Sequence, residues 1–312
     1  DVYNVAIGYY AGRLVTTGAE NVLIGGLAGD ALTTGEKNTA IGTQTLGTED
    51  TGSRNIAIGY WALKNLNYDG AAYNVAIGYQ AATTLTTGVY NTIIGGLAGT
   101  NLTTGNYNVA LGMQALEAED AHGYNTAIGF EALKTLNAGA NAFNVALGFQ
   151  AARLMSTGTN NTIIGSYAGD ALTTGVNNVA IGRSALSSED AHGYNTAIGA
   201  YALLSQDAGA DAHNTAVGYA TGQAITTGAY NTMIGAYTGD ALTTGADNVA
   251  MGYAALSTED AHGKNVAIGN YALQDQDAGA DAYNVAVGYN AGKEITTGHD
   301  NVLIGGKAGD AL

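Results

Sequence analysis

The acidic residues of this chain recur at spacings that could hold a metal ion. Asp190 and Asp207 lie twelve residues after two successive copies of a repeated motif, and Asp260 and Asp277 occupy the same places 70 residues later. If successive repeats stack at about 4.8 Å, two such carboxylates repel each other unless a cation or water intervenes. Oxygen ligands of this type suit calcium. A solvated acidic ridge is the favoured interpretation, and a calcium site at these four residues is the alternative.

The histidines and glycine-rich segments point to no catalytic site. His122, His192 and His262 recur every 70 residues in Asp-Ala-His-Gly turns, roughly 19 Å apart if repeats stack like strands, which is too far to share a metal. The segment 25–29 has the glycines of a phosphate-binding loop but neither the following helix nor a lysine. No Ser–His–Asp arrangement stands apart from the repeat. We therefore expect no enzymatic activity and no cofactor other than calcium.

The composition excludes several classes of partner. The 312 residues carry a net charge of −16 with only ten basic side chains, which argues against nucleic acid and anionic membranes. Polar residues interrupt every apolar run, so no membrane insertion is expected. There is no cysteine, and therefore no disulfide framework. The 46% share of apolar residues is nevertheless enough to form a core.

An internal repeat explains these regularities. A motif of Asn, a β-branched residue, an apolar residue, an aliphatic residue and Gly occurs eighteen times, at spacings of 17, 17, 17 and 19 residues. The units thus form 70-residue super-repeats over 4–73, 74–143, 144–213 and 214–283, with a partial one over 284–312. Seventeen residues are too few for a helical repeat but suit one coil of a β-solenoid. We predict an all-β fold, a single continuous parallel β-solenoid over 1–312.

Two residues of the motif are predicted to form ladders inside the solenoid. The invariant Asn indicates a stacked amide ladder, with Asn4, Asn21 and Asn161 as members. The aliphatic residue three positions later is assigned to the core. Examples of this aliphatic ladder are Ile7, Ile24 and Ile164. The Gly that follows predicts a sharp corner or a close approach of two backbones.

The residue between these positions faces the other side of the strand. It is usually Ala, but in the second unit of each super-repeat it is large. The large residues are Leu23, Ile93, Ile163, Met233 and Leu303. Because a strand that is apolar on both faces is normally buried on both, we predict that these five residues contact another chain. Self-association, as a homotrimer or an end-to-end filament, is the expected consequence. The alternative is that each of the five residues fills a local widening of its own coil.

The repeats resemble those of known bacterial and viral surface proteins. Asn-Val-Ala-Ile-Gly and Asn-Thr-Ala-Ile-Gly units joined by Thr-Thr-Gly resemble the repeats of phage tail-fibre-like and bacterial surface proteins. They are also similar to the head repeats of trimeric autotransporter adhesins, which are shorter. The resemblance implies a left-handed parallel β-roll in which three chains pack around an axis.

The function expected from this resemblance is that of a fibre or adhesin shaft outside the cell, on a virion or a bacterial surface. Recognition of a receptor or glycan would lie in the turns or in parts beyond this chain, which opens in mid-pattern and is expected to be a piece of a longer one. A subunit of a self-assembling extracellular filament is one alternative. A solenoid protein that binds or processes carbohydrate is the other, although no local break in the repeat marks a cleft.

Overall fold

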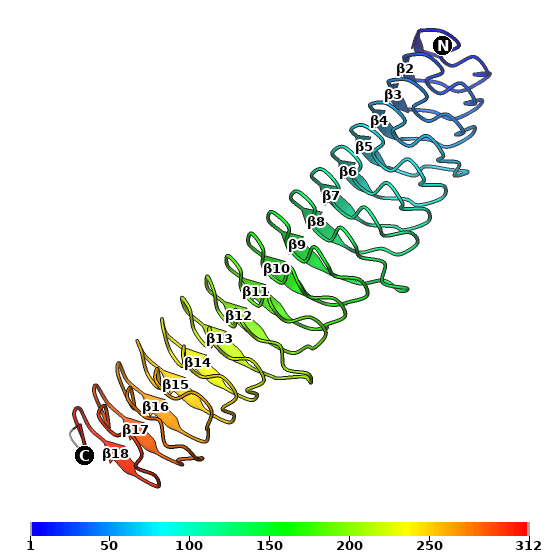
Figure 1. The fold of residues 1–312 in the computed structure, drawn as a ribbon. Coiled ribbons are helices and arrows are strands. Elements are labelled where there is room, and N and C mark those ends of the chain that lie inside the picture. Colours follow the sequence, from blue (N-terminus) through cyan, green and yellow to red (C-terminus); the bar gives the residue numbers. More distant parts are fainter. Residues whose placement is uncertain (1, 311–312) are drawn as a thin grey trace. The chain divides into compact units, whose positions relative to one another are not determined.

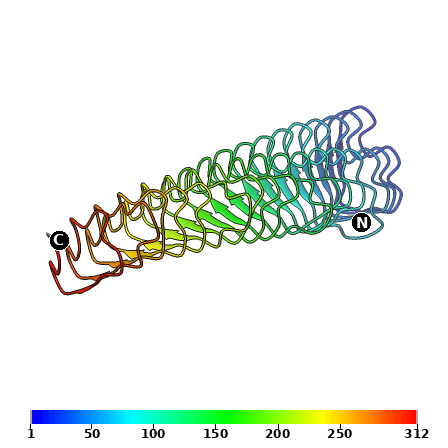
Figure 2. The same ribbon diagram turned by 60° about the horizontal axis from the view of Figure 1, so that its bottom comes forward.

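The structure is a computed structural model that describes residues 2–310, and within them strands and turns occur without any helix. The chain falls into two compact units, one up to Thr159 and one from Asn160 onward, and each is a parallel β-solenoid. In Figure 1 the strands of each unit lie side by side in chain order. Figure 2 shows the turns of successive coils following the same path around the strands. The predicted fold class, an all-β parallel solenoid with coils of about 17 residues, is confirmed.

Each coil contributes one strand of three residues. In the first unit they are β1 (Val5–Ile7), β2 (Val22–Ile24), β3 (Thr39–Ile41), β4 (Ile56–Ile58), β5 (Val75–Ile77), β6 (Thr92–Ile94), β7 (Val109–Leu111), β8 (Thr126–Ile128) and β9 (Val145–Leu147). In the second they are β10 (Thr162–Ile164), β11 (Val179–Ile181), β12 (Thr196–Ile198), β13 (Thr215–Val217), β14 (Thr232–Ile234), β15 (Val249–Met251), β16 (Val266–Ile268), β17 (Val285–Val287) and β18 (Val302–Ile304). Within a unit each strand pairs in parallel with the next, and the register joins equal positions of the repeat.

The asparagine that precedes each strand ties neighbouring coils together. Asn21 Oδ1 accepts the backbone N–H of Asn38 at 2.9 Å, while its Nδ2 donates to the carbonyl of Gly35, in the return turn, at 2.9 Å. Asn161 likewise donates to the carbonyl of Gly175 and accepts from the N–H of Asn178. The amide of Asn4 makes the same two bonds. The amide ladder expected from the sequence is therefore present, and it is buried from Asn21 to Asn284.

The glycine after each strand is required by a close approach of two backbones. At this position φ lies between 127° and 145° in every coil, a region that L side chains rarely adopt. A Cβ placed on Gly25 would lie 2.5 Å from the carbonyl oxygen of Gly42, one coil further on. Any side chain here would push the stacked coils apart, which explains why the motif never departs from glycine.

The aliphatic residue at the third position of each strand was wrongly assigned to the core. Ile7 is 59% exposed, and Ile24 and Ile164 are half-exposed, because the first and third residues of each strand face outward. The small middle residue, such as Ala40, is the buried one. Alternation along a strand defines two faces without saying which faces inward, and the larger side chains were taken to be the inner ones.

The five large middle residues therefore point into their own solenoid and do not contact another chain. Leu23, Ile93, Ile163 and Met233 are fully buried in the single chain, and Leu303, in the last coil, is partly buried. The predicted interchain contact is wrong for these residues. Their size has a local cause, since each reaches toward a glycine eight residues after the motif Asn.

The facing positions in the interior share a fixed volume. Where the position eight after the motif Asn is a leucine, as at Leu116, the middle strand residue is an alanine, as at Ala110. In the second coil of each super-repeat it is a glycine, as at Gly169, and the middle residue is large, so a Cβ on Gly169 would lie 3.3 Å from Ile163 Cδ1. Interiors are packed at nearly crystalline density, so the large side chain comes from one wall in the second coils and from the other wall in the third and fourth coils. In the first coils both positions are small, and the large residue of the next coil lies against them, as Met233 does against Gly222.

This sharing of volume predicts a rescue. Ile163→Ala should lower the free energy of unfolding by about 2–5 kcal/mol because it leaves a cavity, and Gly169→Leu should lower it by about 1–3 kcal/mol because it overpacks the same space. The double variant should recover most of this loss, because it recreates the Ala-and-Leu arrangement of the third coil. The backbone permits the leucine, since φ is 50° at Gly169 and 53° at Leu116.

Chemical denaturation of the wild type, the two single variants and the double variant provides the measurement. A coupling energy of about 0.5–3 kcal/mol is expected from the cycle. Strictly additive losses would show that the two positions do not fill one space.

Candidate functional site

A buried glutamate recurs in the third coil of each super-repeat. Glu49, Glu119, Glu189 and Glu259 have no exposed surface, although their register position is held by aliphatic residues such as Leu32 and Leu102 in other coils. A carboxylate in an aliphatic ladder must be hydrogen-bonded or paired to be tolerated. These glutamates are not among the site residues predicted from the sequence. Their place in the 17-residue register was the signal that would have identified them as buried.

Three of these glutamates accept a hydrogen bond from the backbone of a turn that contains a histidine. Glu189 Oε1 accepts the backbone N–H of His192 at 3.0 Å, and the carbonyl of His192 accepts a hydrogen bond from Asn178 Nδ2 at 3.0 Å. The imidazole is thereby held over the carboxylate, with Nδ1 3.4 Å from Glu189 Oε1. Glu119 with His122 and Glu259 with His262 repeat the arrangement, with Nδ1 to Oε1 distances of 3.3 and 3.5 Å.

Two polar atoms in each of these turns are left without a hydrogen bond. The second carboxylate oxygen, Oε2, and the imidazole Nδ1 are both buried in all three copies and make no hydrogen bond, although Nδ1 lies within ion-pair distance of Oε1. Burial raises the pKa of the Glu259 carboxyl, and the charge of Asp277 raises it further, while the backbone and side chain of His262 and the backbone of Ala278 act in the opposite direction. Unpartnered buried polar atoms are uncommon in folded proteins, and a threefold recurrence requires an explanation.

Of the two predicted aspartate pairs, Asp260 and Asp277 lie together in one cluster, whereas Asp190 and Asp207 do not. Asp260 and Asp277 each place an oxygen within 4.8 Å of ligand atoms of Glu259 and His262. The equivalent group in the preceding super-repeat consists of Glu189, Asp190 and His192, without Asp207. The histidines, expected to be isolated turn residues, thus join the acidic side chains of their own turn.

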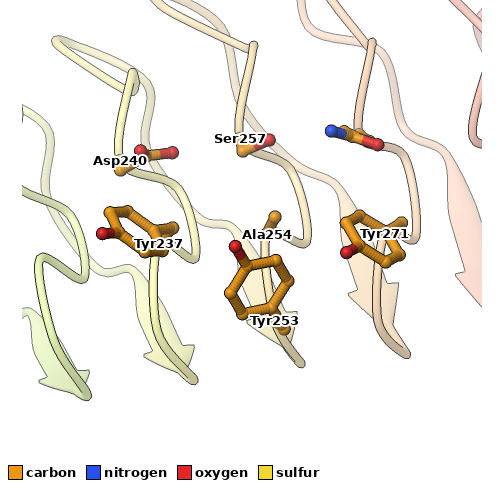
Figure 3. Close-up of a pocket in the computed structure, with 7 residues that line it drawn as sticks. Tyr237, Asp240, Tyr253, Ala254, Ser257 and Tyr271 are labelled. Atoms are coloured by element: carbon orange, nitrogen blue, oxygen red, sulfur yellow. The ribbon is translucent and has the colours of Figure 1, made fainter.

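A second feature is a shallow pocket of about 370 Å³ in the second unit. Tyr237, Tyr253 and Tyr271 project from three successive coils along one side, and Asp240 and Ser257 lie across from the rings (Figure 3). The rings meet edge to face, with centroids 5.9 and 5.4 Å apart.

The polar side of this pocket has unused hydrogen-bonding capacity. One carboxylate oxygen of Asp240 and the amide oxygen of Gln274, which also lines the pocket, are buried without a hydrogen-bond partner. Burial raises the pKa of the Asp240 carboxyl. Both residues occupy the same register position in coils two apart, with Ser257 between them, so this row of polar groups follows the coil stacking.

No protein-family model and no curated protein matches the chain. The class that the fold itself defines is that of a parallel β-solenoid repeat protein. Within residues 2–310 no helix has the length and apolar character that crossing a membrane would require.

The fourth buried glutamate, Glu49, makes stability depend on pH. Burial raises the pKa of its carboxyl from 4.5 to about 7, with a smaller contribution from the charge of Asp50. A raised pKa in the folded state favours the neutral carboxyl, so its stabilising contribution is complete below about pH 4.5 and is lost as the pH rises to about 7. The loss corresponds to about 3 kcal/mol.

Glu49→Gln should remove this loss, because the amide stays neutral. The variant should gain stability relative to wild type between pH 5 and pH 8, as measured by denaturant unfolding at each pH. Glu36→Gln, which removes one negative charge from an exposed site of the same unit, is the matched control and should follow the wild-type profile. Parallel pH profiles for Glu49→Gln and wild type would contradict the prediction.

Proposed function

We propose that the chain is a structural shaft segment of an extracellular fibre in which several parallel copies pack through the outer face of the sheet. The supporting observation is the composition of that face. Both outward positions of all eighteen strands hold Val, Ile, Leu, Met or Thr, and none is charged, although the chain carries a net charge of −16.

This face exposes large apolar side chains in the single chain. Leu111 is 43% exposed, Leu147 is 42% exposed and Met251 is 42% exposed, all at the third position of their strands. Nine strands at about 4.8 Å give a strip roughly 40 Å long in each unit. A continuous apolar strip of this length is larger than the isolated apolar patches usual on monomers, and it favours a covered surface.

A second copy of the chain is the partner that fits this surface. The strip repeats once per coil, and only a surface with the same period can match it along its whole length. An aromatic row precedes the strands, in which Tyr73, Tyr90, Tyr107, Tyr124 and Phe143 stack with centroids 5.0–5.5 Å apart. Acidic surfaces elsewhere on the copies repel, so the uncharged face is left as the one that can associate. We propose a homotrimer, as in the adhesin head repeats that the sequence resembles.

The mass in solution tests this assembly. Sedimentation equilibrium should give three times the 31.4 kDa chain mass, and Leu111→Lys with Leu147→Lys should dissociate the assembly, because burying two unpaired charges is unfavourable. Both positions face outward, so circular dichroism should show an intact solenoid. Thr104→Lys, which adds one positive charge in an exposed turn, is the control and should keep the wild-type mass.

A wild type that remains a monomer at high concentration would overturn the proposed assembly. A broad distribution of masses that grows with concentration would instead favour the filament in which chains stack end to end.

The tyrosine pocket supports a second role, carbohydrate binding by the shaft itself. Aromatic rings offer apolar faces to sugar rings, and the free oxygens of Asp240 and Gln274 can accept hydrogen bonds from hydroxyl groups. Because the rings and the polar row both follow the coil stacking, an extended polysaccharide lying along the stack is the ligand that fits. The pocket is open, which suits binding of a polymer by a surface more than enclosure of a small molecule.

Affinity electrophoresis in gels that contain a soluble glucan, galactan or mannan tests this role. The wild type should be retarded by at least one polysaccharide, and Tyr253→Ala should lose most of the retardation because its ring lies in the middle of the row. Tyr79→Ala removes an exposed ring of the other unit, outside the aromatic row, and should behave as wild type. Equal retardation of both variants would reject the pocket as the binding site.

A further inference from the structure

Three turns of the chain share one constellation of potential metal ligands. Each contains a fully buried glutamate, the exposed or half-buried aspartate that follows it, and a half-buried histidine two residues further on. Within each turn one ligand atom from every member lies within 4.8 Å of the others. The groups are Glu119, Asp120 and His122; Glu189, Asp190 and His192; and Glu259, Asp260 and His262, joined by Asp277.

The acidic residues alone would not indicate a site, but the unpartnered atoms do. In every group the glutamate Oε2 and the histidine Nδ1 are buried and lack a hydrogen bond. Both are donors of electron pairs, one from a carboxylate and one from an imidazole, and both belong to the same turn. An ion bound between them would satisfy the two atoms at once.

The first super-repeat provides an internal comparison. Glu49 occupies the same buried register position, but Gly52 replaces the histidine. There both carboxylate oxygens are used, since Oε1 accepts the N–H of Gly52 at 2.7 Å and Oε2 accepts the N–H of Tyr68 at 3.3 Å. The unpartnered oxygen thus occurs only in the turns that contain the histidine. Glu49 therefore has the hydrogen bonds of a purely structural glutamate, and the other three glutamates lack the one to Oε2.

We propose that each of the three histidine turns binds one divalent transition-metal ion of the zinc type. The glutamate Oε2, an aspartate oxygen and the histidine Nδ1 supply three ligands, and water completes the shell. Imidazole together with carboxylates is a donor set typical of zinc. Calcium, the ion expected from the aspartates alone, takes six to eight oxygen ligands, and these turns bring fewer together.

The ligand atoms have to move closer together for an ion to bind. A tetrahedral zinc ion with bonds of about 2.1 Å separates two of its ligand atoms by about 3.4 Å. The present ligand atoms lie within 4.8 Å of one another, so the widest separation has to shrink by at most about 1.4 Å. The aspartates are the residues that can move, since Asp190 and Asp260 are exposed, whereas the glutamates are held by the backbone N–H of the histidines.

The three sites should differ in affinity. Asp277 adds a fourth protein ligand to the Glu259 group, and it comes from the following coil, so an ion there links two coils. The Glu119 group has Asn137 at the equivalent place. We expect the Glu259 site to bind more tightly than the other two.

Equilibrium dialysis of the metal-free chain against zinc chloride at pH 7.5 tests the proposal. The expected result is three ions per chain, and Glu259→Gln should reduce this to two with loss of the tightest site. The amide keeps the size of the side chain and the hydrogen bond to the N–H of His262, so the fold is preserved. Glu49→Gln is the matched control, because it makes the same change in the turn without histidine, and it should still bind three ions.

The histidines provide the second arm of the test. A variant with His122→Asn, His192→Asn and His262→Asn should lose all three ions, whereas His213→Ala, which alters a histidine outside these turns, should lose none. Cobalt chloride should give a visible absorption band in the wild type that is absent from the triple variant. Zinc binding that survives in the triple variant, or calcium binding with the same stoichiometry and affinity as zinc, would overturn the proposal.

Discussion

A buried asparagine amide in each coil is the interaction on which the rest of this structure depends. Its oxygen accepts a hydrogen bond from the backbone of the next coil, as Asn74 Oδ1 does from the N–H of Asn91. Its nitrogen donates to the carbonyl fourteen residues further along its own coil, as Asn74 Nδ2 does to Gly88. A buried amide has to be paired on both sides, so one side chain fixes both the length of the coil and the register of the stack. The longer fourth coils show the cost of departing from this length, since Asn195 and Asn265 have a buried Nδ2 without a hydrogen-bond partner.

The amide ladder leaves a narrow interior, and this decides which residues face outward. With the strand and the opposite wall so close, one of two facing positions can be large only if the other is small, as for Met233 opposite Gly239. The remaining aliphatic residues of the strand must lie on the outside. The apolar outer face that supports assembly is therefore a consequence of how little the core can hold, and not an independent feature.

The same interior explains why the histidine turns are chemically unusual. A glutamate that takes an aliphatic register position is forced into the core by the stacking, because the amide ladder sets the path of the coil whatever the side chain. Its Oε1 is satisfied by the turn that it closes. In Glu49, Oε2 also accepts the N–H of Tyr68 from the following coil, whereas in the histidine turns Oε2 makes no hydrogen bond. There, carboxylate and imidazole are held together with spare coordinating capacity.

The sequence by itself determined the repeat, the parallel solenoid, the amide ladder and the invariant corner glycine, because each follows from the period and from residues that never vary. It could not decide which face of the strand is inside. Ile24 and Leu23 are both aliphatic, and only the narrow interior and the facing Gly29 assign Leu23 to the core. It indicated acidic turns but not their chemistry, since the burial of Glu189 and the placing of His192 over its carboxylate arise from coil stacking. Local sequence patterns determine the period and the turns. Which side chains share the interior space, and which buried polar atoms lack a hydrogen bond, is decided only when the coils stack.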